Sequence, residues 1–198
     1  MTALELAAQQ LSRMRGMNAM YHRQFFTDIF RTTVVGLVLF GVGFWGIQAA
    51  FLAVPFVALI GAAQTAFDAS YLIFSRHYSH ALEGFINREI GSELLVAHKM
   101  EETYLFPLDT TKIVTIPLDR APTWFGFMTF FYTVIGVYSY VAGLTFGWNL
   151  LTLSGWEVRY GLSLGVLTVA TLAMGVWWFA SGAGERRLRA VLDETFER

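Results

Sequence analysis

Long apolar runs dominate the chain and predict its fold. Between residues 32 and 74 the only charged side chain is Asp68. A single helix over this run would be about twice as long as the hydrocarbon core of a bilayer is thick, so the run must fold back once. We place the break at residues 46–50, shortly before Pro55, because a helix accepts proline in its first turn. Two later runs, 124–148 and 160–182, carry no charge.

The pattern therefore predicts an all-α membrane protein with four transmembrane helices, at about 29–48, 51–74, 124–148 and 160–182. Lys and Arg predict its orientation. All 14 of them except Arg159 fall before the first span or at its start, between spans two and three, or after span four. Loops on the cytoplasmic side of a membrane protein carry an excess of Lys and Arg, so both termini are predicted to be cytoplasmic. The predicted location is the plasma (bacterial inner) membrane, which the chain crosses several times. Tryptophans fall near the span ends, where headgroups favour them.

The remaining segments are amphipathic or polar. Leu4, Ala8 and Leu11 repeat at helical spacing, so residues 1–28 begin with an amphipathic helix, and residues 183–198 repeat that pattern. Segment 75–121 is expected to extend span two as a helix to about Glu89. The predicted divisions are the N-terminal segment 1–28, a first transmembrane hairpin 29–74, a cytoplasmic segment 75–121, a second transmembrane hairpin 122–182 and a C-terminal helix 183–198.

A short β-hairpin is expected inside the cytoplasmic segment. Residues 103–107 and 112–116 are rich in β-branched and aromatic side chains, and they flank a turn-like stretch at 108–111. The segment is too small to hold an enzyme core of its own.

Composition supports the membrane prediction and excludes other classes. The chain is 55% hydrophobic and 15% charged, with a mean hydropathy of +0.49, whereas soluble domains carry about 25% charged residues. The net charge of −1 provides no basic field for nucleic acid. The absence of cysteine excludes thiolate metal sites and cysteine nucleophiles. The expected partner is the lipid bilayer, with no nucleic acid.

Asp68 is the acid that a membrane interpretation must explain, because an unpaired carboxylate in an apolar span costs several kcal/mol. If spans one and two fold back near residue 49, Arg31 lies opposite, and an Arg31–Asp68 ion pair would close the cytoplasmic end of the hairpin. Gln64, Asp68 and Tyr71 recur at i, i+4 and i+7, so they form one polar stripe on span two. The stripe either lines a pathway for ions or protons or bonds to a neighbouring helix.

Small residues at four-residue spacing predict close helix packing, either within one chain or between copies. They are Ala58, Ala62 and Ala66 on span two, Gly143 and Gly147 on span three, and Gly161 and Gly165 on span four.

Catalytic and cofactor motifs are absent from the sequence. There is no nucleophile elbow, zinc-protease helix, phosphate loop or dinucleotide fingerprint. His77, His80 and Glu83 recur every third residue, yet nothing in the sequence brings a further ligand to them. We therefore expect no enzyme, no catalytic or metal site and no cofactor.

Span two ends in a motif that resembles a known family. Asp68-Ala69-Ser70-Tyr71-Leu72 leads into a basic helix that reaches Tyr78. With the preceding amphipathic segment and hairpin, residues 3–90 look like the SLATT or S-4TM proteins, small bacterial membrane effectors associated with nucleotide-signalling conflict systems. The resemblance implies an oligomeric pore whose opening damages the host membrane.

Two functional hypotheses follow from the sequence. The first is a non-enzymatic, homo-oligomeric channel or pore-like protein, in which the Gln64–Asp68–Tyr71 face is wet. The alternative is an accessory or structural subunit of a larger membrane complex, with membrane protein partners and no wet path.

Overall fold

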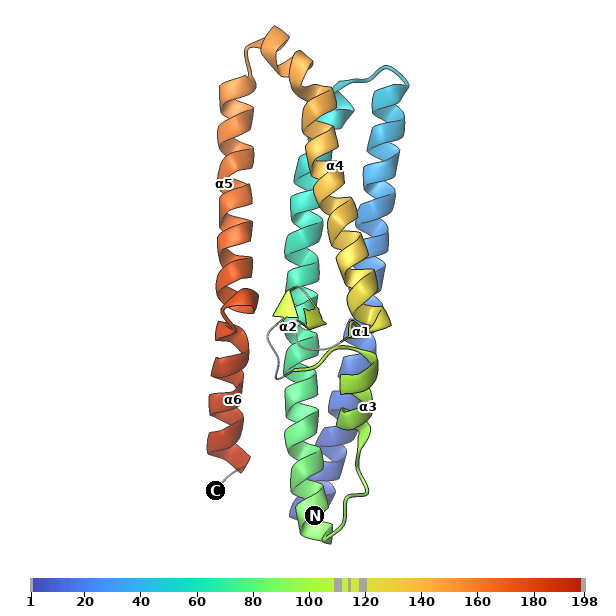
Figure 1. Ribbon diagram of the computed structural model, residues 1–198, viewed down its shortest axis with the longest axis vertical. Helices are drawn as coiled ribbons and strands as arrows, with labels where there is room; N and C mark the ends of the chain where they lie inside the picture. Colours follow the sequence, from blue (N-terminus) through green and yellow to red (C-terminus); the bar gives the residue numbers. More distant parts are fainter. Residues whose placement is uncertain (1, 109–111, 114, 118–120, 197–198) are drawn as a thin grey trace. The chain divides into compact units, whose positions relative to one another are not determined.

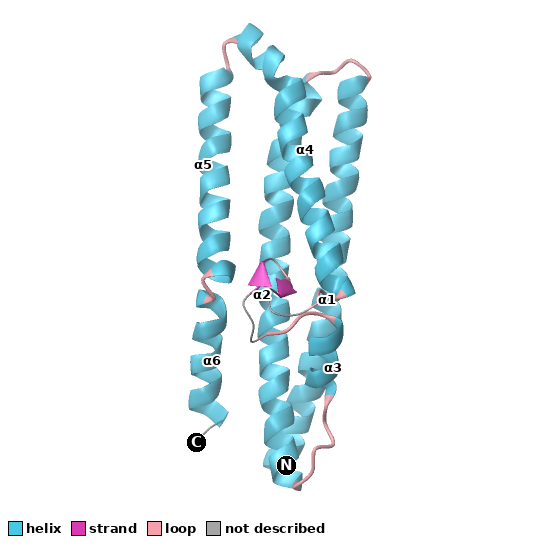
Figure 2. Ribbon diagram, in the orientation of Figure 1, coloured by secondary structure: helices cyan, strands magenta, loops and turns pink. Residues whose placement is uncertain are grey.

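The computed structural model describes residues 2–108, 112–113, 115–117 and 121–196. These residues are predominantly helical (Figures 1 and 2). Along the chain the elements are α1 (Ala3–Phe44), α2 (Ala49–Ile90), α3 (Ala97–Tyr104), β1 (Lys112–Ile113), β2 (Ile116–Pro117), α4 (Trp124–Ser154), α5 (Glu157–Gly175), the π-helical segment η1 (Val176–Ala180) and α6 (Ala183–Phe196). Four of the helical stretches, α1, α2, α4 and α5 with η1, are long and apolar enough to cross a membrane.

The chain forms two compact units. One comprises residues 1–24, 68–130 and 177–198 and is called the polar unit here; the other comprises residues 25–67 and 131–176 and is called the apolar unit. Helices α1, α2 and α4 each contribute to both units, because each runs without a break through the residues that divide them.

The predicted break between the first two spans is confirmed. Helix α1 ends at Phe44, and α2 begins at Ala49, so the first helix ends earlier than the predicted residue 48. Gly46 lies in the turn with φ of 118°, a conformation that side chains with a Cβ rarely adopt. The amphipathic N-terminal segment and the first span are one continuous helix from Ala3. The extension of α2 beyond the span is also confirmed, and it ends at Ile90.

Pro55 differs from its predicted position, because it lies inside α2 rather than in the first turn. A proline has no N–H, so it cannot bond to the carbonyl four residues earlier, here that of Phe51. Gly143 of α4 lies against this step, and a Cβ at Gly143 would come within 2.9 Å of both the Phe51 carbonyl oxygen and the Pro55 Cδ. The missing side chain at position 143 therefore lets α4 pack directly on the proline step.

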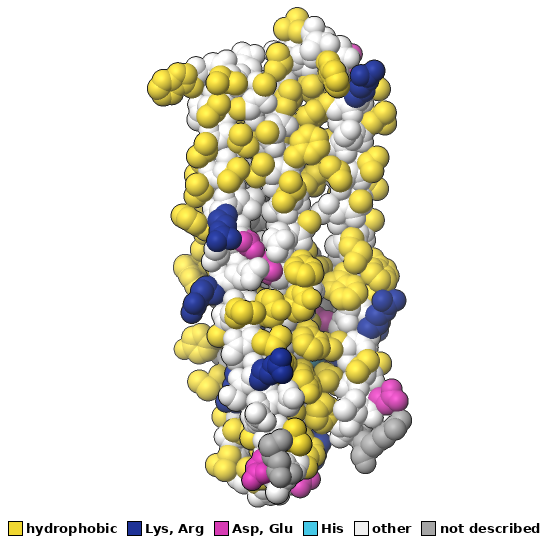
Figure 3. Space-filling model, turned by 180° about the vertical axis from the view of Figure 1, so that it is seen from behind, with side chains coloured by type: hydrophobic (Ala, Val, Ile, Leu, Met, Phe, Trp, Pro, Cys, Tyr) yellow, Lys and Arg dark blue, Asp and Glu magenta, His cyan; other side chains and the backbone are white. Residues whose placement is uncertain are grey.

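Aromatic rings fill the rest of this contact in the apolar unit. The rings of Phe40, Phe44, Phe51 and Phe146 lie with centroids between 5.1 and 6.4 Å apart. Such edge and tilted contacts add to the stabilisation from burial. Many large hydrophobic side chains are exposed, and Figure 3 shows hydrophobic side chains spread over one face of the molecule.

The polar unit has its own hydrophobic core, between the first part of α1 and the extension of α2. Its buried members are Ala7, Leu11, Met14, Leu82 and Ile86. Phe196 near the end of α6 packs against the same cluster, with its ring centroid 6.1 Å from that of Tyr78. The predicted amphipathic stripe at Leu11 thus covers a neighbouring helix in this chain.

The predicted β-hairpin is wrong in its first strand. Residues Thr103 and Tyr104 end helix α3, so residues 103–107 form no strand. The two short strands that the structure describes pair antiparallel, Lys112 with Pro117 and Ile113 with Ile116. Of the predicted turn, residues 109–111 lie outside the described part of the chain. In α3, Glu101 accepts from Asn18 of α1, and the His98 backbone N–H donates to Glu83 of α2. These long-range contacts outweigh the local β preference.

Candidate functional site

The polar unit buries several charged and polar side chains on α2. Asp68, Arg76 and Glu83 are each 1–2% exposed, and Ser75 is fully buried. Charges this deep are normally paired and hydrogen-bonded, because burial without a partner costs several kcal/mol. The contacts of Arg76 and Glu83 form two neighbouring clusters that join α1, α2 and α3.

The first cluster is centred on Arg76. Its Nε donates to Glu101 Oε2 at 3.2 Å, and its Nη1 donates to the Phe106 carbonyl at 2.8 Å. Its Cζ also lies 4.6 Å from the centroid of the Phe106 ring, a cation–π contact. Asn18 of α1 donates to the other Glu101 oxygen at 3.2 Å and accepts from Ser75. One carboxylate therefore ties three helices together.

Burial lowers the pKa of Arg76 from its ordinary value, and the carboxylate of Glu101 opposes that shift. A guanidinium keeps its proton in proteins at any physiological pH. Arg76 is therefore a permanent buried cation, and Glu101 is its counter-ion.

The second cluster is centred on Glu83, about two helical turns beyond Arg76 on α2. Arg15 donates to Oε1 at 2.9 Å, while the His98 ring and backbone N–H both contact Oε2, at 3.0 and 3.2 Å. The His80 ring stacks on that of His98 at 4.2 Å. Burial raises the pKa of Glu83, but the hydrogen bonds from His98 and Arg15 outweigh it, and the net pKa lies below the ordinary 4.5. Glu83 is thus ionised at neutral pH.

His22 of α1 lies beside the first cluster. Its Nδ1 is 3.2 Å from the Asn18 carbonyl, and its ring meets the edge of Phe125 at 5.6 Å. Burial is the largest cause of a lowered pKa at His22, and the nearby Arg76 adds to it. The imidazole is therefore neutral in the folded chain at neutral pH.

Acid is expected to destabilise the polar unit through His22. The folded pKa lies below the ordinary 6.5, so the unfolded chain takes up the proton first, and stability is lost as the pH falls from 6.5 through the folded pKa. In detergent, the thermal midpoint of the wild type should fall more steeply than that of His22→Gln as the pH is lowered from about 7.5 to about 5.5. Parallel slopes for the two proteins would contradict this assignment.

The polar stripe predicted on α2 lies largely inside the chain. Asp68 is 1% exposed, Gln64 is half-buried, and the Tyr71 ring stacks on Tyr21 with centroids 4.8 Å apart. Arg31 Nη1 lies 3.4 Å from Asp28 Oδ1, one turn away on its own helix. The Arg31–Asp68 ion pair stays a prediction.

The small residues separate into two groups. Gly143 and Gly147 of α4 pack on α2, where a Cβ at Gly147 would come within 2.4 Å of the Leu52 side chain. On α5, a Cβ at Gly161 or Gly165 would have no heavy atom of another element within 4 Å in the described part of the chain. Ala58 and Ala66 are half-buried and Ala62 is exposed. The α4 glycines thus serve packing within the chain, and those of α5 lie on an open face.

A second polar stripe, on α4, escaped the sequence analysis. Tyr138, Thr145, Asn149 and Thr152 are spaced seven, four and three residues apart, which places them on one face of the helix. All four are exposed, Tyr138 at 71%. The spacing was visible in the sequence, but a few uncharged polar side chains hardly lower the mean hydropathy of an apolar run. The stripe begins near the middle of α4 and follows its second half.

No three His, Asp or Glu side chains within the described ranges gather where they could hold a metal ion. The His77 side chain is buried, and His80 and Glu83 meet His98 in the contacts given above.

Comparison with other proteins adds no family assignment. No protein-family model matches the chain, and neither curated proteins nor solved structures give a match.

Proposed function

We propose that this chain is a non-enzymatic integral membrane protein that assembles with copies of itself into a channel or pore-like oligomer. The observation that carries the proposal is the exposed polar stripe on α4. Four polar side chains lie on one exposed face of an apolar helix that is long enough to cross a membrane. Thr145 and Thr152 donate to carbonyls of their own helix. Tyr138 and Asn149 present polar groups that are disfavoured against lipid and prefer a water-filled cavity or a partner helix.

The open face of α5 supports self-assembly. In the most apolar stretch of α5 and η1, 6% of the residues are buried within the chain, compared with 22% in α2. Gly161 and Gly165 lie on this sparsely covered helix with space around them, and small residues allow a second helix backbone to approach closely. An oligomer closed through α5 would place the α4 stripes of its members where they could share an aqueous axis.

The distribution of the chain between its two units supports the predicted topology. The polar unit contains residues 1–24, most of the segment between the second and third apolar helices, and residues 177–198. The predicted placement of both termini on the cytoplasmic side of the bacterial inner membrane requires the termini to lie in one unit with this segment, as they do. The proposal also agrees with the oligomeric pore that the resemblance of residues 3–90 to the SLATT or S-4TM proteins implies.

An accessory or structural subunit of a larger membrane complex is the second candidate. The observation that favours it is the burial of Asp68 and the stacking of Tyr71 on Tyr21. The polar side chains of α2 thus serve contacts inside the chain, as expected of a scaffold. In this case the open faces of α4 and α5 would bind helices of foreign subunits.

Conductance across planar bilayers tests the channel directly. The double variant Thr145→Val and Asn149→Leu removes two members of the α4 stripe and should lower single-channel conductance by about tenfold, which corresponds to a barrier about 1.4 kcal/mol higher. Thr133→Val is the matched control, because Thr133 is exposed on another face of the same helix and should leave conductance unchanged.

Native mass spectrometry of gently extracted protein separates the two candidates. A closed ring of identical chains supports the channel. Stoichiometric foreign chains would support the accessory subunit, as would a wild-type protein that forms no conducting events in the bilayer recordings.

A further inference from the structure

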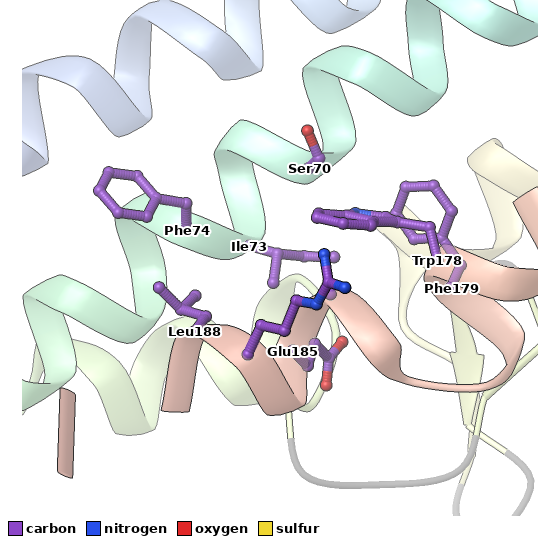
Figure 4. Close-up of a pocket in the computed structure, with 9 residues that line it drawn as sticks. Ser70, Ile73, Phe74, Trp178, Phe179, Glu185 and Leu188 are labelled. Carbon is purple, nitrogen blue, oxygen red and sulfur yellow. The ribbon is translucent and has the colours of Figure 1, made fainter. Parts of the chain in front are cut away.

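The polar unit contains a cavity where α2 meets η1 and the start of α6. Its volume is about 280 Å³. The apolar part of its lining is Ile73 and Phe74 from α2, Trp178 and Phe179 from η1, and Leu188 from α6. Figure 4 shows these side chains grouped between the two helical segments. The cavity is apolar within and lies at the end of the helical stretch that could cross a membrane.

The backbone is built irregularly around this cavity. Residues 176–180 form a π-helical turn, and Gly182 follows with φ of 68°, so the chain bends between η1 and α6. Gly184 lies against the Trp178 ring so closely that a Cβ there would come within 2.5 Å of it. Short π-helical turns recur at functional sites because they reposition side chains that a regular helix would turn elsewhere.

A basic side chain is part of the cavity lining. Arg187 lines the cavity, and its Cζ lies 5.1 Å from the centroid of the Trp177 ring. Glu185, which also lines the cavity, forms an ion pair with Arg189 at 3.7 Å. Among the ion pairs found between described residues, none involves Arg187. A cation beside an apolar cavity matches an anionic headgroup joined to a hydrocarbon chain.

We propose that this cavity binds one anionic phospholipid, with an acyl chain against Ile73, Phe179 and Leu188 and the phosphate at Arg187. This inference rests on the proposed topology, which puts the site on the cytoplasmic side, where basic pockets between membrane helices hold acidic headgroups. Tryptophan rings beside the site are typical of the headgroup level of a bilayer. The bound lipid differs from the other lipids of the bilayer in two ways. Its headgroup is negatively charged, and its acyl chain lies between α2 and α6.

The test counts retained lipids on the full chain. The protein is reconstituted in vesicles of phosphatidylcholine and phosphatidylglycerol in equal parts, extracted gently and analysed by native mass spectrometry. The wild type should retain one phosphatidylglycerol per chain. Arg187→Gln should weaken that retention about fivefold, which is the effect of one basic residue near an anionic surface. Arg13→Gln, which removes an exposed arginine of α1, should retain the lipid as the wild type does.

A cavity-filling variant tests the apolar half of the site. Leu188→Trp keeps every charge but fills space that the acyl chain would occupy, so it should lose the retained lipid. Helical circular dichroism and gel filtration identify any variant that fails to fold, and an Ile73→Phe variant then replaces it. Equal retention of phosphatidylcholine, unchanged retention in Arg187→Gln, or a second copy of the chain covering the site would each overturn the proposal.

Discussion

The Arg76→Ala variant is expected to lower the free energy of unfolding of the polar unit by about 3–5 kcal/mol, as breaking a buried ion pair does. Three interactions are lost together. Glu101 loses its counter-ion, the Phe106 carbonyl loses its donor, and the Phe106 ring loses the guanidinium that covers it. Water has little access to replace the hydrogen bond to the Phe106 carbonyl, because Phe106 is 3% exposed.

Unfolding in mild detergent, followed by circular dichroism or the protease sensitivity of segment 97–108, measures this loss. Arg88→Ala is the control, because Arg88 is an exposed arginine on the same helix, and its change should stay within about 0.5 kcal/mol. Replacing the pair together, as Arg76→Met with Glu101→Leu, should recover much of the stability, since an apolar pair leaves no unpaired charge. Equal losses in Arg76→Ala and Arg88→Ala would show that the buried pair does not hold the unit together.

The Glu83→Gln variant is expected to destabilise the polar unit by about 2–3 kcal/mol at neutral pH, the range for hydrogen bonds to a buried charged group. Glutamine has the same shape but one fewer acceptor. Arg15 would face an amide in place of a carboxylate, and the ring and backbone N–H of His98 would compete for a single oxygen.

The loss should disappear in acid, and the sign follows from the pKa of Glu83. The pKa of Glu83 in the folded chain lies below 4.5, so the ionised carboxylate stabilises the fold above pH 4.5. This stabilisation is lost as the pH falls through the pKa of the folded chain. The thermal midpoints of wild type and Glu83→Gln should therefore converge below about pH 4.5. Glu93→Gln serves as the control, because Glu93 pairs with Lys99 at the exposed surface and should change little at any pH. A gap between wild type and Glu83→Gln that stays constant with pH would refute the ionised cluster.

The helical framework was predictable because hydropathy and length act over whole segments. A charge-poor run longer than a bilayer must turn back, and the turn occurs at Gly46, where backbone freedom was visible in the sequence. The extension of α2 was predictable for the same reason, since no strong breaker precedes Gly91. The first strand of the hairpin failed because β-branched residues report a local preference, while residues 97–104 are held as a helix by distant partners on α1 and α2.

The polar site was predictable only in its parts. Arg76, Glu83 and His98 stood out as ionisable residues in the segment after span two, but the sequence carries no signal that joins positions 15, 83 and 98. Their meeting depends on the packing of α1 on α2, where hydrophobic side chains such as Ala7 and Leu11 are buried. The face of α4 that carries Asn149 was missed for the opposite reason. Its periodicity was present in the sequence, but its exposure required knowledge of which face α4 turns toward α2.

The position of Arg76 in the chain has a consequence for biosynthesis. Its two acceptors, Glu101 and Phe106, lie 25 and 30 residues further on. At about 5–20 residues per second, a ribosome needs about one to six seconds to make that stretch. Until that stretch is made, the guanidinium lacks both of these acceptors, so the buried contacts of Arg76 cannot form. The first cluster is therefore expected to assemble late, after residues 101–106 have left the ribosome.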